Sequence, residues 1–134
     1  MTERVKAAVI VLVTADSRAE AERLASALVS ERLAACVNVL PRVVSIYRWR
    51  GAVERASEVL LVIKTRRALV ARVDRCVRTL HSYEVPEVLA LPVAAGSRRY
   101  LAWLMAETRG AVGEKRGQAR HARAPRAVRR SRDG

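Results

Sequence analysis

The sequence predicts an α+β fold: a four-stranded antiparallel sheet with helices on one face, a long central hairpin and a short C-terminal helix. The main observation is the order of the patterns, because strand-like apolar runs and helical periodicities follow one another as strand-helix-strand, strand-helix-strand, helix. The second is composition. The 134 residues suffice for one domain with a core, and since Phe is absent that core must consist of Val, Leu, Ala and Ile.

The first strand-helix unit opens with an apolar run over residues 7–13, which is typical of a buried strand. Ser17 and Glu20 follow with the spacing of a capping box, in which the Ser hydroxyl and the Glu carboxylate each bond a free N–H at the helix start. The apolar residues of the next stretch fall on one helical face, and the helix is expected to end near Arg32.

A long hairpin is predicted in the middle of the chain. Residues 35–49 resemble one strand, and Pro41 marks a bulge or an edge because proline cannot donate to a ladder. Arg50 and Gly51 turn the chain, and residues 53–65 return as a second long strand. This hairpin is longer than a small sheet needs, so its overhanging edges are expected to pair with another subunit.

The second half repeats the first. Apolar residues from Leu69 to Leu80 predict an amphipathic helix, residues 87–93 predict the last strand, and Ser97 is a suitable cap for a third, short helix. Two strand-helix-strand halves of similar length form the ferredoxin-like arrangement.

Charge divides the chain into a domain of residues 1–108 and a tail of residues 109–134. The domain has 17 Lys and Arg against 11 Asp and Glu, whereas the short tail has 9 against 2. No apolar periodicity continues into the Arg-rich tail, which is therefore predicted to be disordered. Its composition suits nucleic acid, but it has no aromatic residue for base stacking, so nucleic acid is not the expected partner.

Two cysteines, Cys36 and Cys76, are too few for a disulfide framework. No apolar run approaches the 18 residues of a membrane span. These features predict a cytoplasmic protein without a membrane partner.

The segment of residues 81–87, with the sequence HSYEVPE, combines an imidazole, a phenol and two carboxylates at a helix-to-strand junction. Such junctions are where binding sites are built. The alternative is structural: Pro86 ends the helix and Tyr83 covers the edge of the core.

Several segments together resemble the CutA family of divalent-cation tolerance proteins over residues 7–108. They are AACVN at 34–38, SIYRWRG at 45–51, IKT at 63–65, HSYEVPE at 81–87 and YLAW at 100–103. The resemblance implies a ferredoxin-like fold, a homotrimer built through the long hairpin, a shape related to PII signalling proteins, and a link to copper and other divalent metals. It implies no enzymatic reaction.

The resemblance is incomplete at the positions linked to copper. Some members have a Cys before the Thr of the first strand and paired His residues in the later segment, where this chain has Val13 and Leu80 and retains His81. The family usually has Pro after that His, where this chain has Ser82.

The candidate metal ligands are His81, Cys36 and Glu84, for copper or another divalent cation bound weakly. Each has a structural alternative, because His81 can cap a helix, Cys36 can pack in the core and Glu84 can pair with an arginine.

The candidate ligand cleft comprises Lys64, Tyr83, Glu84 and Trp103. Tyr47 and Trp49 are two apart on one strand, share a face and are assigned to the trimer interface. The predicted function is therefore homotrimeric metal tolerance by binding, without enzymatic activity. The alternative is a PII-like sensor that holds a small anionic effector between subunits.

Overall fold

The computed structural model describes residues 7–111 and confirms the predicted α+β fold. The strands are β1 (Ala8–Ala15), β2 (Cys36–Trp49), β3 (Ala52–Arg66) and β4 (Leu89–Pro92). They form one antiparallel sheet in the order β2-β3-β1-β4. The helices are α2 (Arg18–Ser30), α3 (Val70–Leu80) and α4 (Arg98–Glu107), with a 3₁₀ turn at Arg67–Leu69. None of these described helices is long and apolar enough to cross a membrane.

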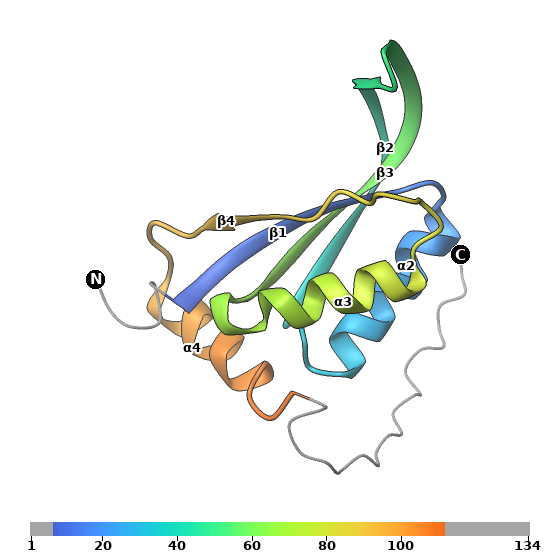
Figure 1. Cartoon of the computed structure of the whole chain (residues 1–134). Coiled ribbons are helices and arrows are strands. Elements are labelled where there is room, and N and C mark those ends of the chain that lie inside the picture. The colour runs from blue at the N-terminus through green and yellow to red at the C-terminus, as the bar shows by residue number, and fades with distance from the viewer. Residues whose placement is uncertain (1–6, 112–134) are drawn as a thin grey trace.

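The core lies between one face of the sheet and the helices α2 and α3 (Figure 1). Alternate residues of a strand point to the same face, so β1 turns Val9, Val11 and Val13 toward this core. Leu24 of α2 and Val73 of α3 meet them and are fully buried. Helix α4 packs at the end of the sheet where β1 begins, and its Leu101 and Leu104 form a second small cluster with Ala8.

Helices α2 and α3 leave the other face of the sheet uncovered, although it is largely apolar. Its half-buried or exposed residues are Ile10 and Leu12 of β1, Leu40 of β2, Leu60 and Val62 of β3, and Leu89 and Leu91 of β4. We call this set the open face. Along β1 and β3 its residues alternate with buried apolar residues that face the helices, as a half-covered antiparallel sheet requires.

The central hairpin extends well past β1, as predicted. Strand β1 pairs with β3 only up to the partners Ala15 and Val59, whereas β2 and β3 continue to pair as far as Trp49 and Ala52 (Figure 1). The register shifts between Leu40 and Val43, so the proline between them marks a bulge. Arg50 and Gly51 both have positive φ, which suits a two-residue hairpin turn.

Several details differ from the prediction, beyond shifts of one or two residues at other element ends. Strand β4 begins at Leu89, two residues after the predicted start. The Ser17 half of the capping box is present, but the Glu20 carboxylate bonds Ser82. Ala111 is buried in the main core, three residues past the predicted end of the domain. The rest of the predicted tail lies outside the described residues.

Replacement of Leu28 by Ala should destabilise the fold. Leu28 is fully buried in the main core, so truncation leaves a cavity, and the free energy of unfolding should fall by about 2–5 kcal/mol. The neighbouring Val29 is 43% exposed, and Val29→Ala should change it by less than about 0.5 kcal/mol. Urea unfolding at one protein concentration measures the free energy of unfolding of both variants. An equal loss of stability in the two variants would contradict the assignment of Leu28 to the core.

Candidate functional site

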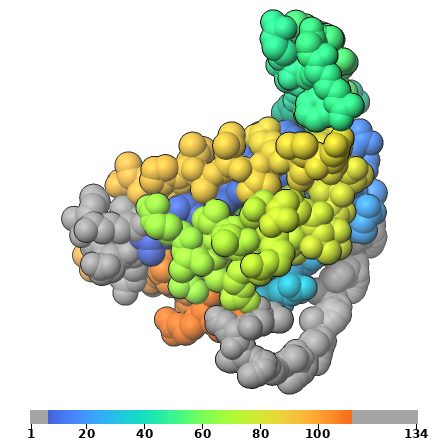
Figure 2. All heavy atoms as spheres, viewed as in Figure 1, coloured from blue at the N-terminus to red at the C-terminus, as the bar shows by residue number. Residues whose placement is uncertain are grey.

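A groove lies between the overhanging hairpin and the segment that follows α3. Its volume is about 680 Å³. Figure 2 shows the hairpin standing above that segment. The lining residues come from the end of β1, both strands of the hairpin and the segment 83–87; they are Thr14, Asp16, Ser45, Ile46, Tyr47, Trp49, Ala56, Glu58, Tyr83, Glu84, Val85 and Glu87. Four of them are carboxylates, so the groove is acidic although the chain is basic.

His81 lies at the C-terminus of α3 and its side chain is fully buried. Its Nε2 is 2.7 Å from the carbonyl oxygen of Thr14, and its Nδ1 is 3.0 Å from the backbone nitrogen of Tyr83. A carbonyl can only accept and an N–H can only donate, so this arrangement assigns the tautomer with hydrogen on Nε2. Both ring nitrogens are engaged, and the imidazole holds Tyr83 against β1.

Glu20 lies in the first turn of α2 and is 5% exposed. Its carboxylate accepts hydrogen bonds from the backbone N–H of Ser82, at 2.7 Å, and from the Ser82 hydroxyl, at 3.0 Å. Burial opposes ionisation of Glu20. The two bonds from Ser82, with a further backbone hydrogen bond from Asp16, outweigh that effect and hold the pKa of the Glu20 carboxyl below its ordinary value.

Tyr83 connects this buried cluster to the groove. Its hydroxyl donates to Glu58 Oε2 at 2.6 Å, and its ring contacts that of His81 at 4.6 Å between centroids. Burial, the bond to Glu58 and the surrounding carboxylates raise the pKa of Tyr83 far above its usual range. Partial burial and the charge of Glu58 also raise the pKa of Glu87. Negative charge is therefore crowded at this end of the groove.

The hairpin turn reaches the opposite wall of the groove. Arg50 Nη2 lies 3.2 Å from Glu84 Oε1, and the Arg50 guanidinium lies over the Trp49 ring at 5.1 Å from its centroid. Both charged side chains are mostly exposed, so the pair contributes little to stability.

The groove brings together four of the residues predicted from the sequence: Tyr83 and Glu84 from the ligand-cleft set, and Tyr47 and Trp49 from the interface set. Lys64 lies elsewhere, on the open face, where its amino group contacts Asn38 and the Cys36 thiol. Trp103 lies on α4 against Tyr100. The predicted ligand cleft is therefore not assembled within one chain.

The predicted metal set of His81, Cys36 and Glu84 is not assembled within one chain either. Cys36 pairs with Lys64, which pairs with Ile10, whereas His81 bonds Thr14, four residues further along β1. At about 3.3 Å per residue the offset along the strands alone is about 13 Å, and Cys36 also lies two strands away from β1. Within residues 7–111, no three His, Cys, Asp or Glu side chains are arranged to hold a metal ion together.

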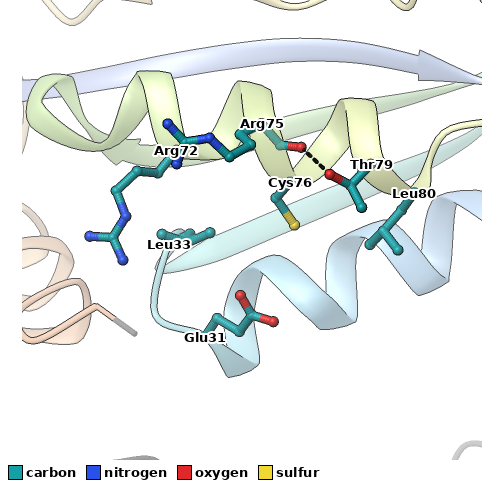
Figure 3. Close-up of a pocket in the computed structure, with 7 residues that line it drawn as sticks. All are labelled: Glu31, Leu33, Arg72, Arg75, Cys76, Thr79 and Leu80. Carbon is teal, nitrogen blue, oxygen red and sulfur yellow. Dashed lines mark hydrogen bonds between the residues drawn. The ribbon is translucent and has the colours of Figure 1, made fainter. Parts of the chain in front are cut away.

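A second hollow, of about 440 Å³, lies between α2 and α3 (Figure 3). Cys76 points into it from α3, between Leu33 and Leu80, with Glu31 on α2 across the opening. Burial, together with the charge of Glu31, raises the pKa of the Cys76 thiol. Cys76 packs against the helix-covered core and Cys36 lies on the open face, so the two thiols are on opposite sides of the sheet.

The sequence prediction missed Glu20, Ser82 and Glu58. Glu20 fitted the pattern of a capping box, so nothing in the sequence pointed to a second partner. In the structure it contacts Ser82, 62 residues later. Glu58 had a recognisable signal, because it is the carboxylate directly before the buried run that begins at Val59. Ser82 was noticed as a departure from the family, without a role.

Comparison with known proteins gives these residues a family context. The family described as CutA1 divalent ion tolerance protein matches residues 9–107. The chain belongs to the CutA1 family. The Thermus thermophilus divalent-cation tolerance protein CutA is 48% identical over 99 residues, which cover 74% of this chain and 96% of that protein. The chloroplastic CutA of Arabidopsis thaliana is 46% identical over 101 residues, 75% of this chain but 56% of that longer protein.

Solved CutA1 structures agree with the fold. The Thermus thermophilus protein has a TM-score of 0.74 and 48% identity, with 75% of this chain and 98% of that chain covered. The Oryza sativa CutA1 crystal structure has a TM-score of 0.77 and 41% identity, with 81% of this chain and all of that chain covered.

The lowered pKa of Glu20 predicts acid sensitivity. Its charged form stabilises the fold above the ordinary value of 4.5, and this contribution disappears as pH falls from about 4.5 through the lower pKa of the folded state. Urea unfolding should show Glu20→Gln clearly less stable than wild type at pH 7, with the difference narrowing toward pH 3. The exposed Glu22→Gln is the control. A difference that does not vary with pH would contradict this assignment.

Proposed function

We propose that the chain acts in divalent-cation tolerance as a homotrimer that binds its ligand in the groove, without catalysing a reaction. The CutA1 family is described by divalent ion tolerance. The observation that carries the binding role is the groove itself, where Asp16, Glu58, Glu84 and Glu87 surround one space. The Tyr83 hydroxyl donates to Glu58, but the raised pKa of Tyr83 disfavours the phenolate that a nucleophile would need, so the site suits binding better than catalysis.

Assembly is supported by the open face. Leu89 is 57% exposed and Leu91 46%, and these side chains adjoin the half-buried Ile10 and Leu12. A continuous apolar surface of this kind is costly in water and marks an interaction site. Beyond Ala15, the edge of β3 that faces β1 also has no partner strand among residues 7–111. A second copy of the chain can cover the apolar open face and pair with the free edge of β3. The proposed number of subunits, three, follows from the resemblance to the family.

The ligand that suits the groove is a hard divalent cation. Carboxylate oxygens suit such ions, whereas copper favours thiolates and imidazoles. Copper bound by His81 would require the ring to leave Thr14 or Tyr83, and Cys36 lies too far away to join it. The four carboxylates surround the groove and do not converge on one point, so the cation would keep part of its water shell and bind weakly.

The PII-like alternative requires two copies. Lys64 and the exposed pair Tyr100 and Trp103 suit an anionic, aromatic effector, but they lie apart from Tyr83 in one chain. A neighbouring subunit could place them across a shared cleft. The cytoplasmic location expected from the sequence also stays a prediction, because the Arabidopsis relative is named chloroplastic.

Charge on the open face should prevent assembly. Leu91→Asp places a carboxylate in the proposed interface, and light scattering at micromolar concentration should show dissociation to a monomer. The matched control is Val29→Asp on α2, where the original side chain is 43% exposed and the helix lies on the opposite side of the sheet from the open face. It should remain trimeric. A trimeric Leu91→Asp variant, or a monomeric wild type, would refute assembly through the open face.

Cation affinity should depend on the groove carboxylates. Calorimetric titration with Mn²⁺ at pH 7.5 should show about ten-fold weaker binding, about 1.4 kcal/mol, for Glu84→Gln and for Glu87→Gln. The control Glu54→Gln changes an exposed hairpin carboxylate outside the groove and should bind as wild type does. The pKa of Glu87 is raised, so Glu87 takes up a proton at a higher pH than an ordinary glutamate. Protons therefore compete with the cation for this carboxylate, and cation binding should weaken toward pH 5.

Copper provides the discriminating measurement in the same series. If Cu²⁺ binds tightly and Glu84→Gln and Glu87→Gln do not weaken it, the groove is not the cation site. Tight binding of an anionic nucleotide with no binding of Mn²⁺ or Cu²⁺ would favour the effector alternative.

A further inference from the structure

The hollow between α2 and α3 lies on the helix-covered side of the sheet, opposite the open face. Most of its lining comes from α3, at positions that follow helical spacing and therefore form one stripe along the helix (Figure 3). These residues are Arg72, Arg75, Cys76, Thr79 and Leu80, and we call this set the α3 stripe. Leu33 and Glu31 complete the lining from the other wall.

The α3 stripe has a cationic end and an apolar end. Arg72 and Arg75 lie toward the start of the helix, whereas Cys76 and Leu80 lie toward its end. The thiol belongs to the apolar end because its raised pKa keeps it uncharged at neutral pH. Thr79 donates its hydroxyl hydrogen to the Arg75 carbonyl of its own helix, so this hydrogen is not available to a ligand.

The cationic end has charge to offer a partner. Arg75 has no salt-bridge partner among the described residues, whereas Arg78 on the same helix pairs with Asp74 at 3.3 Å. Residues 67–80 contain four arginines and one aspartate, a net charge of +3. The first turn of α3 also has no acidic residue and no side-chain cap, so the helix dipole adds to the positive charge there. A carboxylate from another molecule is therefore favoured at this end.

The apolar end is incompletely packed. Cys76 is small and half-buried, and it leaves an open space between Leu33 and Leu80, whose side chain is 46% exposed. Apolar walls that lack partner atoms lose dispersion contacts, which a large apolar side chain from outside would restore. The Glu31 carboxylate faces Cys76 across the opening (Figure 3), so a second acidic group is disfavoured at this end.

The dimensions suit a short peptide. Arg72 and Leu80 are eight residues apart, about 12 Å along the helix axis, which about four extended residues span. A single ion would contact the cationic end alone and leave the apolar end uncovered. Assembly through the open face would leave this side of the sheet accessible.

We propose that the α3 stripe is a docking site for an acidic segment of a partner protein. A carboxylate of that segment pairs with Arg75 and Arg72, and a large apolar side chain packs on Cys76 and Leu80. Charge complementarity selects this occupant, because a basic segment such as the tail of this chain would be repelled by the arginines. The inference is independent of the proposed function, since no residue of the stripe lines the groove.

The test titrates the full-length, isotope-labelled chain with terminally capped peptides and follows amide NMR shifts. The probes are Glu-Glu-Ser-Leu-Leu and its reverse, Leu-Leu-Ser-Glu-Glu, because the direction of the bound segment is open. At least one should shift the amides of residues 72–80 saturably, with a Kd below about 1 mM. Glu-Glu-Ser-Ser-Ser should bind at least about ten-fold more weakly, because it retains the charge and lacks the apolar side chains.

Three variants locate the contact. Arg75→Gln and Leu80→Ser should each weaken binding at least about five-fold. The matched control Arg23→Gln removes the same charge from an exposed position of α2 outside the hollow, and its Kd should stay within about two-fold of wild type. Each replaced side chain is exposed, so all three variants are expected to fold.

Alkylation of the two cysteines by iodoacetamide is the second readout, assigned by mass spectrometry of proteolytic fragments. Saturating peptide should slow alkylation of Cys76 at least about five-fold, because the bound segment covers the thiol. Cys36 lies on the other side of the sheet and is the internal control, so its rate should not change.

Several outcomes would overturn the proposal. Absence of peptide binding, or equal weakening by Arg75→Gln and Arg23→Gln, would leave no specific docking site. Inorganic phosphate that reproduced the shifts and the protection of Cys76 would make the stripe an anion site and not a peptide site. Protection of Cys76 that rises with protein concentration in the absence of peptide would assign the hollow to a second copy of this chain.

Discussion

The helices α2 and α3 cover one face of this sheet and leave most of the other face open, and much of the molecule follows from that constraint. With α2 and α3 packed on Val9, Val11 and Val13, the alternation of β1 necessarily turns Ile10 and Leu12 to the other side. Neither α2 nor α3 reaches that side, and α4 contacts only its end, at Ala8. The open face and the overhanging hairpin therefore both expose surface that the described residues do not cover. The groove lies beside this surface, where the hairpin leaves the sheet.

The acidic groove contrasts with a basic chain. Formal charge over the whole sequence is +13, yet the groove lining contains Asp16, Glu58, Glu84 and Glu87 and no lysine or arginine. Arg50 supplies a positive charge from the hairpin turn, in an exposed pair with Glu84. Local arrangement, not net charge, thus determines what this surface attracts, because exposed charges separated by more than about 10 Å are largely screened at physiological salt.

The fold was predictable from the sequence because its signals are local. The apolar run of β1, the Ser17 and Ser97 caps and the bulge at Pro41 each depend on a few neighbouring residues. The candidate site was predictable only in part. Tyr83 and Glu84 were found because they share one unusual segment, whereas Glu20 and Glu58 contact it from far along the chain. Helical and strand periodicities contain no information on which buried carboxylate meets which loop.

The strand order has a consequence for synthesis of the chain. β1 is the first strand of this sheet to leave the ribosome but occupies an interior position, between β3 and β4. Its partners on β3 lie about 44 to 58 residues later, and those on β4 later still. The nascent β1 therefore has two unsatisfied edges until most of the domain has emerged, and contacts of such long sequence separation form slowly. Helix α2, which follows β1 directly, is the first element that can shelter its valines during that interval.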